Sequence, residues 1–131
     1  MENRIVPTLP SQREPLRIVI DSDVANEIDD LYAIALALRA PERFAIEGFV
    51  ATHFAQVAGR DSTQRSYDLL IELLDAANMA GAFNVARGGD PMVYLDEASD
   101  SDGARLIIER AHAGSEENPL WVLGLGAATN L

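Results

Sequence analysis

Short apolar runs alternate along the chain with longer segments that favour helices. The first run, residues 16–20, is β-branched and apolar, which is typical of a strand buried on both faces of a parallel sheet. Residues 31–40, which follow it, are rich in Ala and Leu and favour a helix. Strands are expected at about 16–20, 44–52, 83–86 and 120–125, and helices at about 29–39, 61–78 and 103–113. This alternation predicts an α/β fold: an open, mostly parallel sheet with helices on both faces.

Turn-forming residues indicate one domain preceded by an arm. Prolines at 7, 10 and 15 limit regular structure in residues 1–15, which we expect to form a flexible N-terminal arm. Residues 16–131 are long enough to bury a core of their own, and no linker divides them. The acidic, turn-rich segment 87–102 is expected to be a long surface loop, with Gly88-Gly89 as a plain turn.

Five acidic side chains crowd the ten residues after the first expected strand, in the sequence DSDVANEIDD. We expect them in the loop at the carboxyl end of the strand, where open α/β sheets bind ligands. Neighbouring carboxylates repel one another unless protons or a cation neutralise them. The cluster therefore predicts a hard divalent metal held by oxygens. An EF-hand does not fit, because Ala25 and Tyr32 would fall at its fifth and twelfth positions.

Two motifs resemble those of a known family. An Asp-x-Asp strand end, followed by Asp29-Asp30 and an Ala-rich helix, is similar to the signature of the inosine-uridine-preferring nucleoside hydrolases. The form here is longer, with Asn26 and Glu27 inserted, and the shorter motif assigns these two residues no role. The C-terminal segment PLWVLGLGAATNL resembles the family's strand-turn-helix segment ending in G-x-x-T-N-[LI]. Weaker matches lie between the two motifs, at 62–70 and 101–111. The resemblance covers residues 16–131.

The resemblance implies a calcium-dependent enzyme that cleaves the N-glycosidic bond of ribonucleosides, giving ribose and free base. By position in the motif, Asp23 would bind the metal and take a proton from the attacking water. Asp29 would bind a ribose hydroxyl, and Asp30 would hold calcium through both carboxylate oxygens. Asp21 would support or ligate the metal, and the backbone carbonyl of Leu125 would be a further ligand. For Asp29, capping of the helix N-terminus is the alternative role.

These residue types suit the implied chemistry. Cleavage of a ribosyl bond builds positive charge on the sugar, which nearby carboxylates stabilise. Water bound to a metal has a lowered pKa, so that a carboxylate can complete its deprotonation near neutral pH. His53 follows the second expected strand, on the same edge of the sheet, and is expected to face the substrate. A packed or surface histidine is the alternative. Thr129 and Asn130 are expected to start and cap a helix behind the metal loop.

The chain departs from the family pattern at two places. Family chains are considerably longer, and their second half supplies another aspartate ligand and, in many members, a His near the leaving base. This sequence ends at Leu131, so we expect the N-terminal half of a hydrolase, without part of its metal shell and most of its base-binding wall. Activity of this chain alone is therefore an open question. Many members also carry Gly-Asn after the second strand, where this chain has residues 50–54, VATHF. The nucleoside substrate is left unassigned.

The composition of the chain limits which binding partners and which cellular compartment we expect. A net charge of −11 argues against nucleic acid and anionic membranes as partners, because their phosphates would be repelled. The absence of cysteine excludes disulfides, thiolate zinc sites and cysteine nucleophiles, and it suits a reducing cytoplasm. The N-terminus lacks an apolar signal core, and no run approaches the ~20 apolar residues that cross a bilayer. We expect a cytoplasmic protein that binds a small nucleoside.

Two other functions remain open. Asp21-Ser22-Asp23-Val24 also resembles the D-x-D-x-[TV] motif of haloacid-dehalogenase-type phosphatases, with Asp21 as nucleophile, Asp23 as general acid and magnesium as cofactor. That motif does not call for Asp29-Asp30 or for the G-x-x-T-N segment. The chain could instead be a non-catalytic, metal-binding or oligomerising module. An unfinished sheet exposes an edge and apolar surface, so self-association into homo-oligomers is expected.

Overall fold

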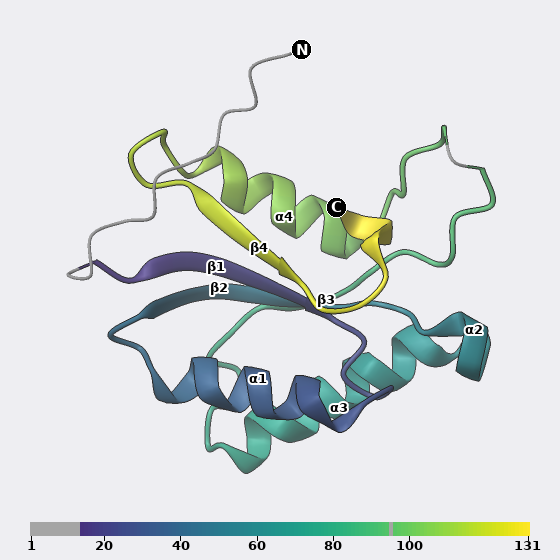
Figure 1. The fold of residues 1–131 in the computed structure, drawn as a ribbon, viewed down its shortest axis with the longest axis horizontal. Coiled ribbons are helices and arrows are strands. Elements are labelled where there is room, and N and C mark those ends of the chain that lie inside the picture. Colours follow the sequence, from purple (N-terminus) through teal and green to yellow (C-terminus); the bar gives the residue numbers. More distant parts are fainter. Residues whose placement is uncertain (1–13, 95) are drawn as a thin grey trace.

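The computed structural model in Figure 1 describes residues 14–94 and 96–131. In chain order the elements are β1 (Leu16–Ser22), α1 (Ile28–Arg39), β2 (Phe44–Ala51), α2 (Ala55–Ala58), α3 (Ser62–Ala76), β3 (Val85–Arg87), α4 (Asp102–His112), β4 (Leu120–Gly124) and a 3-10 turn at Ala128–Asn130. The strands form one open, all-parallel sheet with interleaved helices, which confirms the expected α/β fold. The expected N-terminal arm lies, up to residue 13, outside the described residues.

The strand order is β3-β2-β1-β4, so β1 lies between β2 and β4. The connections from β1 to β2 and from β2 to β3 step in one direction across the sheet. The chain then returns to place β4 on the other side of β1. At such a switch point the loops that leave two neighbouring strands diverge and open a crevice at their carboxyl ends. The acidic segment after β1 and the glycine-rich segment after β4 both start there.

Helices cover both faces of the sheet, with α1 and α3 on one face and α4 on the other (Figure 1). Successive β1 residues therefore enter two different apolar clusters. Ile18 and Ile20 belong to the cluster beneath α1 and α3, while Val19 packs with Val50 and Leu106 on the α4 side. Burial on both faces explains why the β1 sequence is a continuous apolar run.

Strand β1 is two residues longer than its apolar pattern predicts. Asp21 pairs with Val50 of β2 and Gly124 of β4, and Ser22 pairs with Ala51. Asp is disfavoured in strands and Ser is polar, so the hydrophobic pattern stops before the hydrogen-bonded ladder does. The expectation that Asp21 lies in the loop is therefore wrong. The short helix α2 was also not expected from the sequence.

The outer strands β3 and β4 form the two edges of the sheet. Beside the β4 edge, Leu123 and Leu125 are 37% and 40% exposed. Open sheet edges and exposed apolar side chains favour self-association. Self-association of this chain stays a prediction. None of the helices described in residues 14–94 and 96–131 is long and apolar enough to cross a membrane.

Candidate active site

The structure gathers three of the sequence-predicted acids at the carboxyl end of β1. Asp21 is 1% exposed within the strand, Asp23 is half-buried just after it, and Asp30 is 8% exposed in the first turn of α1. Burial is the largest cause of the raised pKa of Asp21 and of Asp30, and repulsion from Asp23 also raises both, so the three carboxylates interact. We call them the acid cluster. Asp29 lies beside it, with its side chain exposed.

Asp21 carries an uncompensated buried carboxylate. Its Oδ2 accepts a hydrogen bond of 3.0 Å from Nδ2 of Asn130, while its Oδ1 is buried without a hydrogen-bond partner. The pKa of Asp21 is raised to about 6: burial is the largest cause, the bond from Asn130 lowers the pKa, and repulsion from Asp23 raises it. Because a buried, unsatisfied charged oxygen is costly, this atom calls for a proton or a cation.

The side chain of Asp30 is held in place by a hydrogen bond from a residue of β1. The Ser22 hydroxyl donates a 2.6 Å hydrogen bond to Oδ2 of Asp30. Burial raises the pKa of Asp30, the bond from Ser22 lowers it, and the charges of Asp23 and Asp29 raise it. The residue preceding the helix is Glu27, and it makes no side-chain capping bond. The capping role considered for Asp29 is therefore wrong, because Asp29 already lies within the first turn of the helix.

Asp23 faces the crevice and is oriented by a turn. The Asn26 side chain donates from Nδ2 to Oδ2 of Asp23 at 3.2 Å, and the Asn26 backbone N–H donates to the Asp23 carbonyl at 2.7 Å. A Cβ at Gly126 would lie 2.8 Å from Oδ1 of Asp23, so only glycine allows this close approach. Asn26, from the inserted pair that the sequence motif left unassigned, thus orients the carboxylate of Asp23.

A cavity of about 290 Å³ opens beside Asp23. Its lining comes from the turn after β1, the segment around α2 and the segment after β4: Asp23, Asn26, His53, Phe54, Ala55, Gln56, Val57 and Ala127. His53 lies in the wall of this cavity, and its contact with a substrate stays a prediction. Its Nδ1 lies 3.5 Å from the Ala55 N–H, and its Nε2 forms a hydrogen bond of 2.8 Å with Oγ1 of Thr129. Both ring nitrogens are engaged within the protein.

The segment after β4 closes the other side of the crevice. The Leu125 N–H donates to the Asp21 carbonyl at 2.8 Å, so Leu125 lies beside Asp21; its role as a carbonyl ligand stays a prediction. Residues Ala128–Asn130 form only one 3-10 turn, and no side chain caps it. Asn130 is instead buried against Asp21, a contact that sequence reasoning missed. Its position just after a strand was the only available signal, because the order of the strands was unknown.

The donor atoms of this site suit a hard cation, but they do not form a closed coordination shell. Carboxylate oxygens are the ligands that calcium prefers, and the unpartnered Oδ1 of Asp21 is the atom that most needs one. Within residues 14–94 and 96–131, however, no three His, Cys, Asp or Glu side chains are grouped so that they could hold a metal ion. The described residues thus fit part of a calcium shell, which water, carbonyl or substrate oxygens would have to complete.

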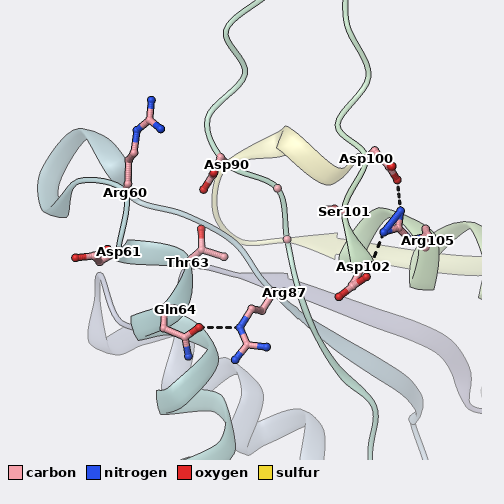
Figure 2. Close-up of a pocket in the computed structure, with 12 residues that line it drawn as sticks. Arg60, Asp61, Thr63, Gln64, Arg87, Asp90, Asp100, Ser101, Asp102 and Arg105 are labelled. Atoms are coloured by element: carbon pink, nitrogen blue, oxygen red, sulfur yellow. Dashed lines mark hydrogen bonds and ion pairs between the residues drawn. The ribbon is translucent and has the colours of Figure 1, made fainter.

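A second, polar hollow of about 450 Å³ lies next to Gly88 and Gly89 (Figure 2). Its wall includes three arginines and four aspartates: Arg60, Arg87, Arg105, Asp61, Asp90, Asp100 and Asp102. Arg105 is paired with Asp100 and Asp102, and Arg87 donates to Gln64 while lying 3.8 Å from the centre of the Tyr67 ring. Because the four aspartates outnumber the three arginines, the hollow offers no net attraction to an anion. Gly88-Gly89, expected to be a plain turn, forms part of its wall.

Comparisons of the chain with protein-family models, with curated proteins and with solved structures found no match. The chemistry of the site and the two motifs are therefore what points to a function.

Proposed function

We propose that this chain carries the cation-binding and water-activating part of a calcium-dependent N-ribohydrolase, which hydrolyses ribonucleosides to ribose and free base. The observation that supports this most is the acid cluster: buried carboxylates without a counter-charge, at the switch point of an open parallel sheet. Uncompensated buried acids in a crevice are typical of functional sites, because stability alone would select against them.

In this proposal Asp23 takes a proton from the attacking water. Its carboxylate lies in the cavity wall and is oriented by Asn26, as a general base requires. The water oxygen bonds to C1′ of the ribose as the C1′–N bond breaks, and the base leaves with the bonding electron pair. The negative charges of the cluster stabilise the positive charge that develops on the sugar.

Asp21 and Asp30 would hold calcium together with the backbone carbonyl of Leu125. When bound, calcium would polarise the water and fix the sugar hydroxyls. Asp29 is exposed beside the cluster and is proposed to accept a hydrogen bond from a ribose hydroxyl. The cavity walls at Phe54 and His53 would face the rest of the nucleoside.

The phosphatase alternative is less well supported. It requires an oxygen of Asp21 to attack a phosphorus atom, yet that side chain is 1% exposed. One of its oxygens is held by Asn130, and the other is buried. An in-line attack needs an accessible nucleophile, so the geometry favours Asp21 as a ligand or support for a cation.

Calorimetric titration of the full chain at neutral pH, with calcium and then magnesium, tests the proposal. Calcium-selective binding is expected, with loss of at least tenfold in affinity in Asp30→Asn. Asp75→Asn, which removes the same charge from the exposed side of α3, should bind as the parent does. A preference for magnesium would favour phosphoryl chemistry, and no binding of either ion would refute the proposal.

Release of free base from inosine and uridine then separates an enzyme from a binding module. A hydrolase should lose activity by about 10²-fold or more in Asp23→Asn, because a positioned general base contributes on this order. Calcium binding without any release of base would instead support the non-catalytic module.

A further inference from the structure

Asn130 is a buried amide whose orientation is determined by its neighbours. It is 7% exposed, and its Oδ1 accepts two hydrogen bonds, from the Gly89 N–H at 2.8 Å and from the Ser101 hydroxyl at 2.9 Å. The Gly89 N–H can only donate, so the side-chain oxygen must face Gly89 and the NH₂ group must face Asp21.

The NH₂ group of Asn130 serves two acceptors. Nδ2 donates to Oδ2 of Asp21 at 3.0 Å and lies 3.4 Å from Oγ1 of Thr52. The Thr52 hydroxyl donates its own hydrogen to the Ala127 carbonyl at 3.1 Å, so it is an acceptor toward Asn130. All hydrogen-bond directions agree with one arrangement of the amide. Because its oxygen and its NH₂ group are both engaged, the Asn130 amide is held in a single orientation.

The groups that hold Asn130 are themselves fixed. The Ser101 hydroxyl oxygen also accepts from the Ala104 N–H at 3.0 Å as the N-cap of α4. A Cβ at Gly88 would lie 2.5 Å from Nδ2 of Asn130, so glycine is required for this approach. Gly88, Gly89 and Ser101, which belong to the wall of the polar hollow in Figure 2, thus contact Asn130 and fix its orientation.

Asn130 holds Asp21 without neutralising it. A Lys or Arg at this position would satisfy the carboxylate and compete with a cation, whereas a neutral amide binds one oxygen and leaves the negative charge in place. The oxygen that remains is Oδ1, the buried atom without a partner. Fixing Oδ2 therefore determines where Oδ1 lies.

We propose that Asn130 is the positioning residue of the cation site, holding Asp21 so that Oδ1 is presented to a hard divalent cation such as calcium. This inference rests on the proposed function. Partners that orient metal ligands from the outer shell change metal affinity by about 10- to 100-fold when they are removed. A purely structural role would lower the stability of the protein and leave the affinity of its folded molecules unchanged.

Calcium titration by calorimetry on Asn130→Ala tests the inference, together with thermal unfolding in the absence of calcium. The calcium Kd is expected to rise by about 10-fold or more. Asn130→Ser is a milder second variant, since its hydroxyl is too short to reach Asp21. Leu74→Ala, a core substitution in α3 away from the acid cluster, controls for lost stability and should change the Kd by less than about twofold.

The outcomes separate the two proposals. If the parent chain binds calcium and the folded Asn130 variants bind it equally well, the positioning role is overturned while the proposed function stands. If the parent binds no calcium, the proposed function fails, and the role of Asn130 fails with it. Weakened binding in both Asn130 variants, with Leu74→Ala unaffected, supports the inference.

Discussion

Strand β1 carries buried charge near both of its ends, but only the charge at its amino end is neutralised. There the Arg17 guanidinium forms a two-pronged ion pair with Glu47 of β2, with Nη2 2.9 Å from Oε2. The remaining donors reach the carbonyls of Arg110 at 3.0 Å and Asn118 at 3.1 Å. Charge and hydrogen-bonding capacity are both matched at this end, as a structural ion pair requires.

At the carboxyl end of the same strand, every ionisable member of the cluster is an acid. Asp21 receives a neutral amide in place of a cation, and Asp30 receives a neutral hydroxyl. Burial raises the pKa of both acids, repulsion from Asp23 raises it further, and the hydrogen bonds from Asn130 and Ser22 only partly oppose this. One sheet thus contains a matched pair that holds strands together and an unmatched cluster that calls for a cation. The difference points to ligand binding at the carboxyl end.

Breaking the matched pair should have the largest effect on stability. Glu47→Ala leaves Arg17 unpaired and is expected to lower the free energy of unfolding by about 3 kcal/mol, at the low end for a buried pair because the two side chains are 12% and 21% exposed. Urea denaturation measures the loss. Replacing both residues by Met should recover most of it, since no unpaired charge remains. A loss below about 1 kcal/mol would mean that the pair behaves like a surface ion pair.

Removing the buried charge of Asp21 from the acid cluster should instead raise the stability of the protein. Asp21 titrates near 3.8 when unfolded and near 6 when folded, so the folded state binds more protons between these values. Stability contributed by this group therefore falls as pH rises from about 4 to about 6, by on the order of 3 kcal/mol, and stays low above that. Asp21→Asn should stabilise the metal-free protein at pH 7 and flatten this pH dependence. Urea denaturation from pH 4 to 7 measures both, and an unchanged pH profile would refute the assignment.

Calcium should stabilise the parent protein by supplying the missing positive charge. At a free concentration of 100 times Kd the gain is about 2.7 kcal/mol, seen as a rise in Tm that a chelator reverses. Asp30→Asn should lose most of this response, while Glu47→Ala, which alters only the opposite end of β1, should keep it. Equal responses from the two variants would show that calcium does not act through the acid cluster.

The smallest effect is expected from Asn26→Ala. Its hydrogen bond to Asp23 is exposed, so removing it should cost less than about 1 kcal/mol of stability. Any activity should fall by more than this loss explains, because Asp23 would no longer be held in one orientation. Thermal unfolding and base release, measured on the same preparation, compare the two effects. A fall in stability without a fall in activity would make Asn26 a structural residue only.

Much of the fold could be predicted from the sequence, because hydrophobic periodicity is a local property. The apolar run at residues 16–20 lies within β1, and the expected helix at 29–39 lies within α1. The hydrophobic pattern did not predict where β1 ends, because polar residues continue the strand. Asp21 and Ser22 continue β1 only because β2 and β4 supply hydrogen-bond partners on both sides, and no local pattern reports those partners.

By itself, the sequence determined the alternation of elements and the concentration of acids after the first strand, because both are encoded within ten or so neighbouring residues. Only the tertiary structure decided that Asp21 is buried, that Asn26 orients Asp23, and that Asn130 binds Asp21 from 109 residues further along the chain. That last contact depends on β4 lying beside β1. The order of strands follows from the packing of the whole sheet, in which distant segments compete for the same edge, and no single segment records the result.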